Sequence, residues 1–249
     1  MPKVTVLMPT YNMEEYVHEA VESILRQDYR DFELLVMDDG STDRTVEVVK
    51  GFDDSRIRLM VNDRNLGLAE NLNRGLDHIA TEYVARMDGD DLSLPQRLAV
   101  QVAYMEAHRD IDLCSCAMQL FGERDEVWVR EDDPEKVKVT ALFFSPVLHA
   151  SSLWRRDAFE SKGLRYRQEY VPAEDYDLWC RALAAGLRLT NLPDVLYRYR
   201  IRAGQPTLLR NGQEARVRRE YRRRTLLKPG YYNPWLLARR VVKRVWWRT

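Results

Sequence analysis

Apolar runs and helical patterns alternate through the first part of the chain, and this order restricts the fold more than any other feature. Runs typical of buried strands lie at Lys3–Pro9, Phe32–Met37, Arg56–Val61 and Tyr83–Met87. Between them, helices are expected at Tyr16–Leu25, at a segment that Ser41-Thr42-Asp43 can cap, and at Leu66–Ile79. Such a β-α alternation predicts an α/β fold with a Rossmann-like, mostly parallel sheet flanked by helices.

Polar segments follow three of the predicted strands. Pro9-Thr10-Tyr11-Asn12 follows the first strand, Asp38-Asp39-Gly40-Ser41-Thr42-Asp43 the second, and Asp88-Gly89-Asp90-Asp91 the fourth. Each segment alone is also typical of an ordinary turn. Because ligands of such sheets bind at the carboxyl ends of the strands, we expect the three segments to line one crevice. Together they supply an aromatic face, an acceptor for a base N–H and metal ligands, all of which a nucleoside diphosphate uses.

The acidic segment carries three carboxylates in four positions, Asp88, Asp90 and Asp91. Carboxylates this close repel one another, and a cation would neutralise them; a solvated acidic turn is the alternative. Mn2+ or Mg2+ suits such oxygens and takes its remaining ligands from substrate phosphates. Neither G-x-G-x-x-G nor G-x-x-x-x-G-K-[ST] occurs, which disfavours dinucleotide dehydrogenases and P-loop enzymes. Phosphate charge would therefore be met by the metal and by Arg74, Arg86 or Arg202.

A second acidic pair, Glu174-Asp175, lies far downstream. Pro172 and Ala173 lead into it, and an apolar stripe at helical spacing follows it, formed by Leu178, Trp179, Ala182 and Leu183. The pair is therefore expected at a helix N-terminus, where the helix dipole favours carboxylates whether or not they have a function. If this end faces the crevice, one of the two can remove a proton from an acceptor hydroxyl as a general base.

The composition is that of a globular protein, with 45% hydrophobic and 31% charged residues among 249. No apolar run is long enough to span a membrane and the start of the chain does not resemble a secretory signal, so we expect a cytoplasmic protein. Its three cysteines, Cys114, Cys116 and Cys180, are expected to be reduced core thiols.

The net charge of zero conceals an asymmetry. Residues 208–249 contain 13 Lys and Arg against 2 Glu, whereas residues 1–207 contain 26 basic and 37 acidic residues. Tryptophans at 235, 246 and 247 are interleaved with arginines, as in a basic amphipathic helix on an anionic membrane surface. Packing of this tail on the acidic body, or nucleic-acid binding, are the alternatives. Because the body shows no nucleic-acid-binding module, we expect peripheral attachment to the cytoplasmic face of the membrane and no nucleic-acid partner.

Six motifs occur in one order between residues 3 and 205: Met8–Asn12, Met37–Asp43, Asn65–Gly67 with Asn73–Gly75, Arg86–Asp91, Pro95–Leu98 and Glu174–Trp179. In residue type, order and spacing they resemble family 2 of the inverting glycosyltransferases, which have the GT-A fold. The resemblance implies a hexosyltransferase-type enzyme with a nucleotide-sugar donor, usually UDP-linked. It further implies a divalent metal, Mn2+ or Mg2+, and a single displacement onto a glycan or lipid-linked saccharide.

The resemblance also implies roles for individual residues. It assigns Asp175 as general base with Glu174 beside it, and Asp90 and Asp88 as metal ligands. Donor contacts are expected from Pro9, Thr10, Tyr11, Asp39, Asn65, Asn73, Arg74, Arg86, Asp88 and Arg202, and acceptor contacts from Asp91, His149 and Trp179. Arg202 stands where many relatives carry histidine; it can bind phosphate but cannot ligate a metal.

This organisation predicts a nucleotide-sugar-binding half (1–110), an acceptor and base half (111–207) and the basic helical tail (208–249). Residues 112–170 should build the acceptor pocket, where Trp128, Phe143, Phe144 and Trp154 either stack on sugar rings or belong to the core. A non-catalytic nucleotide-sugar-binding or scaffold protein on the same fold is the alternative function. A nucleotidyltransferase would need a glycine-rich phosphate loop and a lysine near the start, and the chain shows neither.

Overall fold

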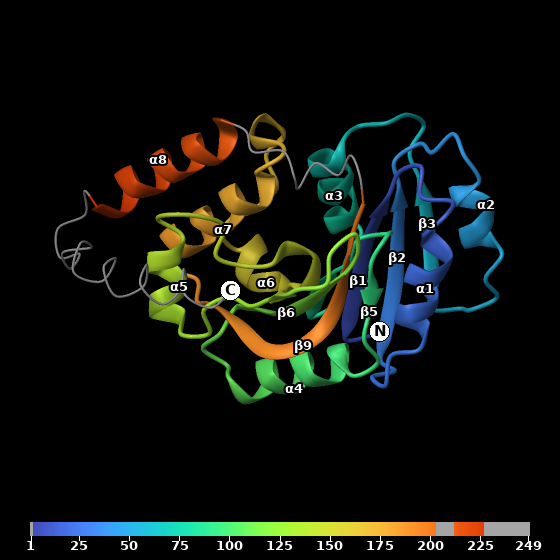
Figure 1. Ribbon diagram of the computed structural model, residues 1–249, viewed down its shortest axis with the longest axis horizontal. Helices are drawn as coiled ribbons and strands as arrows, with labels where there is room; N and C mark the ends of the chain where they lie inside the picture. The colour runs from blue at the N-terminus through green and yellow to red at the C-terminus, as the bar shows by residue number, and fades with distance from the viewer. Residues whose placement is uncertain (1, 203–211, 227–249) are drawn as a thin grey trace.

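The computed structural model describes residues 2–202 and 212–226 (Figure 1). The strands are β1 (Val4–Thr10), β2 (Phe32–Asp38), β3 (Ile57–Val61), β4 (Tyr83–Arg86), β5 (Leu92–Ser93), β6 (Leu113–Gly122), β7 (Val127–Trp128), β8 (Leu153–Arg155) and β9 (Leu189–Ile201). The helices are α1 (Val17–Leu25), α2 (Thr45–Lys50), α3 (Leu68–Asp77), α4 (Arg97–Ala107), α5 (Pro134–Thr140), α6 (Arg156–Glu160), α7 (Glu174–Ala184) and α8 (Gly212–Leu226), with short 3-10 turns η1 (His149–Ser151) and η2 (Gln168–Tyr170). The elements predicted in the first part of the chain, and the helix beginning at Glu174, are confirmed.

The strands form one sheet in the order β3-β2-β1-β4-β8-β6-β9-β5, with β7 paired to β6. Strands β3, β2, β1 and β4 run parallel, as predicted, and β6 runs parallel to β9. The short strand β8 is antiparallel to both β4 and β6 and so joins the two parallel parts. The expected α/β class is confirmed, with this antiparallel junction as the feature that the sequence pattern did not reveal.

The sheet is covered on both faces, which explains why its first strands are continuous apolar runs. On one face, Leu7 and Leu35 pack in a core cluster that includes residues of α3, α5, α6 and α7. On the other face, Val6 and Leu34 pack in a second cluster with residues of α1, α2 and α4. Because β1, β2 and β4 run parallel, their carboxyl ends lie at one edge of the sheet.

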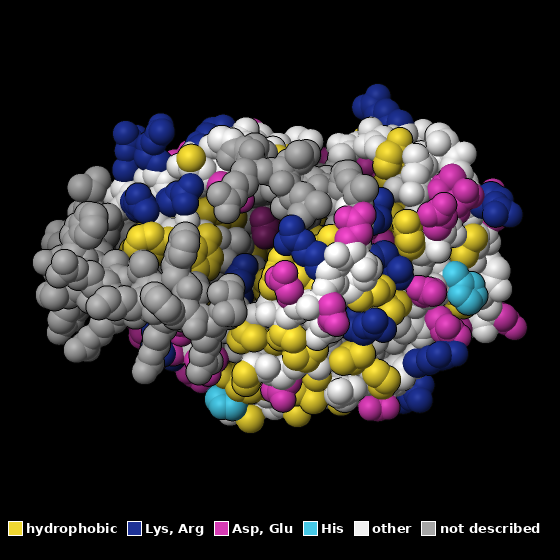
Figure 2. Space-filling view, viewed as in Figure 1, with side chains coloured by type: hydrophobic (Ala, Val, Ile, Leu, Met, Phe, Trp, Pro, Cys, Tyr) yellow, Lys and Arg dark blue, Asp and Glu magenta, His cyan; other side chains and the backbone are white. Residues whose placement is uncertain are grey.

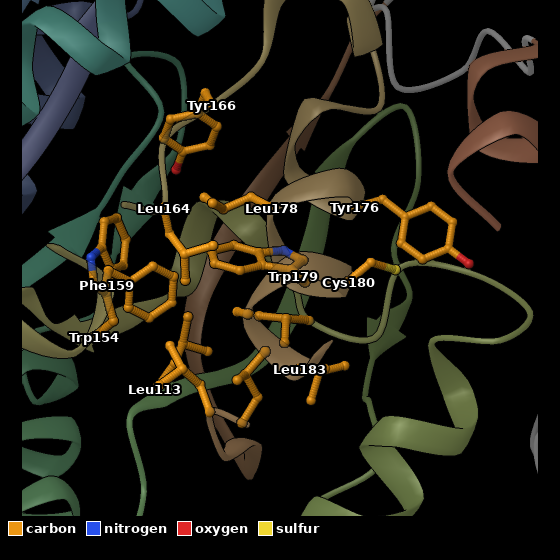
Figure 3. Packing of buried hydrophobic residues seen from close by; sticks show 14 of the residues in the cluster. Leu113, Trp154, Phe159, Leu164, Tyr166, Tyr176, Leu178, Trp179, Cys180 and Leu183 are labelled. Atoms are coloured by element: carbon orange, nitrogen blue, oxygen red, sulfur yellow. The ribbon is translucent and has the colours of Figure 1, made fainter. Parts of the chain in front are cut away.

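Aromatic packing fixes helix α7 against β8. The Trp179 ring meets Trp154 edge-on with ring centroids 6.3 Å apart, and Phe159 with centroids 6.2 Å apart. Figure 3 shows Trp179 pointing from α7 toward these two rings. Such edge-to-face pairs stabilise beyond the area that they bury. They hold the N-terminal end of α7, with its acidic pair, in a defined position. The three cysteines are free and buried, as predicted.

Helix α8 is the described part of the basic tail, and it packs on the body. Val217 and Tyr221 are buried in the same cluster as α7. The hydroxyl of Tyr170 donates to Glu220 at 2.8 Å, and Arg222 Nε donates to the carbonyl of Leu142 at 2.9 Å. The tryptophans at 235, 246 and 247 lie outside the described residues. Within residues 2–202 and 212–226, no helix combines the length and the apolar character that crossing a bilayer requires.

Candidate active site

The loops after β1, β2 and β4 meet at the edge of the sheet. The backbone N–H of Asn12 donates to Ser41 Oγ, and that of Thr42 donates to Asn12 Oδ1, both at 2.9 Å. The acidic loop lies directly against β1, because a Cβ on Gly89 would stand 2.9 Å from Cγ2 of Thr10. The structure thus brings together the three polar segments that the sequence analysis placed in one crevice.

On the predicted nucleoside side, Tyr11 is exposed and Asp39 is buried. The Asp39 carboxylate accepts hydrogen bonds from Asn62 Nδ2 at 2.8 Å and from the backbone N–H groups of Leu66 and Gly67 at 2.9 Å. These bonds hold the loop that leads into α3. An ionised carboxylate offers about four acceptor positions, so a base N–H can still be bound there. The predicted base contact of Asp39 stays a prediction.

Two arginines contact the carboxylates of the acidic loop. Arg86 Nη2 lies 2.7 Å from Asp88 Oδ1, and Arg202 Nε lies 3.0 Å from Asp90 Oδ2. Asp91 instead accepts a hydrogen bond from the backbone N–H of Arg200 at 2.7 Å and is fully buried. Asp91 therefore ties the loop to β9, and the structure does not support the predicted acceptor contact, since a side chain with no exposed surface cannot touch a sugar.

The acidic loop fits a divalent metal. No group of three or more His, Cys, Asp or Glu side chains with metal-binding geometry occurs among the described residues. Mg2+ and similar ions need only one or two protein carboxylates when a diphosphate supplies the rest, and Asp88 and Asp90 provide two. Burial first, and then the charges of Asp88 and Asp90, raise the pKa of Asp91 well above its ordinary value. Negative charge is therefore crowded at this loop, and a bound cation would relieve that repulsion.

Arg86 links the acidic loop to the acidic pair on α7. Its side chain is almost completely buried, and its Nε and Nη1 atoms have no hydrogen-bond partner in the described part of the chain. The carbonyl of Arg86 accepts a hydrogen bond of 2.7 Å from Arg97 Nη2, which fixes the end of β4. A buried guanidinium with unpaired N–H groups is costly unless it faces negative charge. Arg86 meets that charge in Asp88, and its own charge lowers the pKa of Glu174.

Glu174 and Asp175 open helix α7 with perturbed acidities. The pKa of Glu174 is raised to about 7, chiefly by burial and then by the neighbouring Asp175; the charge of Arg86 acts to lower it and that of Asp88 to raise it. Burial raises the pKa of Asp175 to about 6, and Ser145 Oγ lies 3.4 Å from its Oδ2 atom. The acidic loop and the α7 pair therefore influence one another across one site. Figure 2 shows acidic and basic side chains gathered around a hollow near the middle of the face in view.

Beside this site the buried Tyr166, which belongs to no motif, contacts two residues predicted from the sequence, His149 and Asn73. Tyr166 Oη lies 2.8 Å from His149 Nε2, and Asn73 brackets the Tyr166 backbone, accepting from its N–H at 2.9 Å and donating to its carbonyl at 3.0 Å. Burial lowers the pKa of His149 well below its ordinary value, and Arg86 lowers it further, so this histidine is neutral. Asn73 thus joins α3 to the second half of the chain. No periodicity or turn signal around Tyr166 predicts this contact.

The remaining predicted site residues are placed as follows. Pro9 is buried in β1, Arg74 is exposed on α3, and Asn65 accepts a hydrogen bond of 2.9 Å from Gly67 N–H within its own turn. Trp179 is fully buried in the aromatic core. The structure does not support the predicted acceptor contact of Trp179, because its ring is enclosed by the aromatic core and has no surface that a sugar could touch. Its position in the apolar stripe of α7 serves the packing of the core.

Comparison with known proteins identifies the family. The family model described as "Glycosyl transferase family 2" matches residues 5–168. The chain belongs to glycosyltransferase family 2. Two relatives agree with this assignment. EpsE of Bacillus subtilis (strain 168), which is named as a glycosyltransferase, is 39% identical over 203 residues, covering 80% of this chain and 73% of the relative. The Escherichia coli protein "UDP-Glc:alpha-D-GlcNAc-diphosphoundecaprenol beta-1,3-glucosyltransferase WfaP" is 28% identical over 211 residues, covering 80% and 78%.

The fold of the family is seen in a solved structure as well. Residues 1–349 of S. aureus TarS, crystallised in complex with UDP-GlcNAc, superpose with a TM-score of 0.76 at 22% identity. The match covers 92% of this chain and 68% of that 1–349 chain of TarS. At this identity the likeness shows the fold alone, which is the GT-A fold that the sequence motifs predict. The chain is therefore a family 2 glycosyltransferase with a GT-A fold.

Proposed function

We propose that this chain is an inverting, hexosyltransferase-type enzyme that moves a sugar from a UDP-sugar donor to a hydroxyl of a glycan or lipid-linked saccharide. One observation carries the proposal: the loops after β1, β2 and β4 meet at one edge of the sheet, where Arg86 pairs with Asp88 at 2.7 Å, and the charges of both residues affect the pKa of Glu174. The UDP-GlcNAc bound to TarS and the UDP-linked donor in the name of WfaP support the donor class. The diphosphoundecaprenol in the same name supports a lipid-linked acceptor.

The donor is proposed to lie along the edge formed by β1, β2 and β4. Thr10 and Tyr11 face the nucleoside, and Asp39 accepts from the base. Asp88 and Asp90 would hold the Mn2+ or Mg2+ ion, which when bound stabilises the departing diphosphate as a Lewis acid. Arg202, 3.0 Å from Asp90, lies where its guanidinium can donate to the phosphates.

In the proposed reaction the Asp175 carboxylate removes the proton of the acceptor hydroxyl. The hydroxyl oxygen forms a bond to the anomeric carbon while the bond from that carbon to the diphosphate oxygen breaks, and the electron pair of the broken bond leaves with UDP. Because this is one displacement, the configuration at the anomeric carbon inverts. A base with a pKa of about 6 is ionised at neutral pH and is still basic enough to take the proton.

Donor hydrolysis and sugar transfer with a panel of nucleotide sugars and Mn2+ test this mechanism. Asp175→Asn and Asp90→Asn should each lower kcat by at least about a hundredfold, the usual contribution of a general base or of electrostatic stabilisation. Asp157→Asn, whose side chain is 85% exposed, serves as the control and should behave as wild type. Transfer that survives both active-site substitutions would overturn the mechanism. Donor binding without turnover for every donor would favour the non-catalytic alternative.

We further propose that the basic tail attaches the enzyme to an anionic membrane surface on its cytoplasmic side. The tryptophans at 235, 246 and 247, which alternate in the sequence with the arginines at 239, 240, 244 and 248, support this proposal. Because α8 also packs on the body, the informative truncation removes only residues 227–249. Flotation with vesicles containing anionic lipid should recover the full chain and lose the truncated one. Equal recovery of both forms would place the contact elsewhere.

A further inference from the structure

The segment Phe143-Phe144-Ser145 borders the proposed base. Ser145 Oγ lies 3.4 Å from Asp175 Oδ2, and the two phenylalanines that precede it are half-buried. This segment follows α5 and belongs to the region in which the acceptor pocket is expected. The two phenylalanines therefore directly precede, in the chain, the residue that contacts the proposed base.

Arginines lie over both rings. The Arg130 guanidinium stands 5.6 Å from the centre of the Phe144 ring, and the Arg222 guanidinium of α8 stands 5.6 Å from the centre of the Phe143 ring. Arg218, one turn earlier in α8, donates to the carbonyl of Phe143. We call the set formed by Arg130, Phe143, Phe144, Arg218 and Arg222 the arginine-aromatic ridge. It joins the α5 region to α8 beside the base.

The charge of Arg130 interacts with that of the proposed base. Its Nε atom is buried and has no hydrogen-bond partner among residues 2–202 and 212–226. Burial lowers the pKa of Arg130, whereas the charge of Asp175 raises it. Leaving a guanidinium N–H desolvated and unpaired is unfavourable, so the free protein carries a donor that an anionic ligand would satisfy.

We propose that the arginine-aromatic ridge binds the phosphate groups of the acceptor, which is a saccharide joined through a diphosphate to a lipid. This inference rests on the proposed function. Guanidinium groups donate two parallel hydrogen bonds to phosphate, and the phenylalanine rings suit the apolar part of the same molecule. A neutral glycan would leave the Arg130 Nε unpaired beside the bound sugar.

Acidic groups face the same space. Asp175 is required there as the base, and Glu214, exposed at the start of α8, raises the pKa of Asp175. Glu174 lies beside Asp175 as a third carboxyl group, but its raised pKa of about 7 leaves it partly protonated at neutral pH. The three arginines of the ridge therefore still exceed the carboxylates in charge, and the local balance favours an anion. The carboxylate of a uronic acid shares this anionic chemistry with a diphosphate. The experiment therefore needs separate acceptors for the two sources.

The variants for the test are Arg130→Gln and Arg222→Gln, with Arg219→Gln, on the exposed side of α8, as the matched control. Three acceptors are compared: a short-chain lipid diphosphate saccharide, the same saccharide as a neutral alkyl glycoside, and a uronic acid glycoside. Binding of each acceptor by calorimetry and KM for transfer are both measured. Donor hydrolysis without acceptor shows that each variant is folded and binds the donor.

Arg130→Gln should weaken binding of the diphosphate acceptor about tenfold, the size expected for one charge-assisted hydrogen bond, and leave the neutral glycoside and donor hydrolysis unchanged. If Arg130→Gln weakens binding of the diphosphate and the neutral acceptors equally, the ridge has only a structural role and the proposal is overturned. Weakening confined to the uronic acid would also overturn it. If wild type binds the diphosphate acceptor and Arg130→Gln does not, while no donor is turned over, the ridge stands and the proposed enzymatic function fails.

Discussion

Replacing Glu174 by glutamine should stabilise the protein at alkaline pH. Glu174 is buried at the start of α7, and its Oε2 atom has no hydrogen-bond partner among the described residues. Burial and the neighbouring Asp175 raise its pKa from 4.5 to about 7. Glutamine has nearly the same shape and cannot ionise, so it mimics the protonated acid at every pH.

The size of the effect follows from the shift in pKa. The folded protein binds the Glu174 proton more tightly than the unfolded chain, so the stability due to this group is present at low pH and is lost as the pH rises from 4.5 through about 7. A shift of this size corresponds to about 3 kcal/mol above pH 7. The glutamine variant keeps that stability, and most of its advantage over wild type disappears by about pH 5.

Urea unfolding at several pH values between about 5 and 8.5 measures the difference in free energy of unfolding between the two proteins. Glu47→Gln, on the exposed face of α2, is the control for adding a glutamine, and its difference from wild type should not change with pH. If the curves of wild type and Glu174→Gln run parallel across this range, the carboxyl group is solvated. The electrostatic link between the acidic loop and α7 would then be wrong.

Three further outcomes are expected. The kcat/KM for transfer should fall as the pH drops through about 6, because Asp175 must be ionised to act as base; a profile that stays flat to pH 5 contradicts this role. Asp177→Ala should cost about 3 kcal/mol in urea unfolding, since it leaves two arginines without their buried partner, and a loss near zero would show that solvent replaces it. Asn73→Ala should cost about 1–3 kcal/mol, because Asn73 bonds twice to the Tyr166 backbone, and unchanged stability would contradict this; a raised KM for the donor in the same variant would support the donor contact predicted from sequence, which stays a prediction.

The first half of the fold could be predicted because its signals are local. Strands β1, β2 and β4 are buried on both faces and read as unbroken apolar runs, and the helices between them show a clear helical period. The second half could not be predicted in the same detail. Strand β8 has only three residues, which is too short for the alternating pattern of a strand to appear, and it passes directly into α6. Its antiparallel pairing is determined by neighbours distant in sequence.

The site shows a similar division. The positions of the acidic residues at the ends of β4 and at the start of α7 followed from the sequence, because each adjoins a predictable element. What their side chains contact did not follow. Asp91 bonds to the backbone of Arg200, and Tyr166 bonds to Asn73, 93 positions away along the chain. Residue type alone does not distinguish a carboxylate that binds substrate from one that holds a loop, because both roles use the same acceptor atoms.

The three buried thiols have a practical consequence. Burial raises the pKa values of Cys114, Cys116 and Cys180, so in the native state each is both shielded and protonated. Maleimide reagents, which need an accessible thiolate, should spare them. A single cysteine engineered on the surface would then take a fluorophore alone without removal of the natural ones. The same natural thiols would become reactive whenever the surrounding core opens, so their rate of modification would report how often it does.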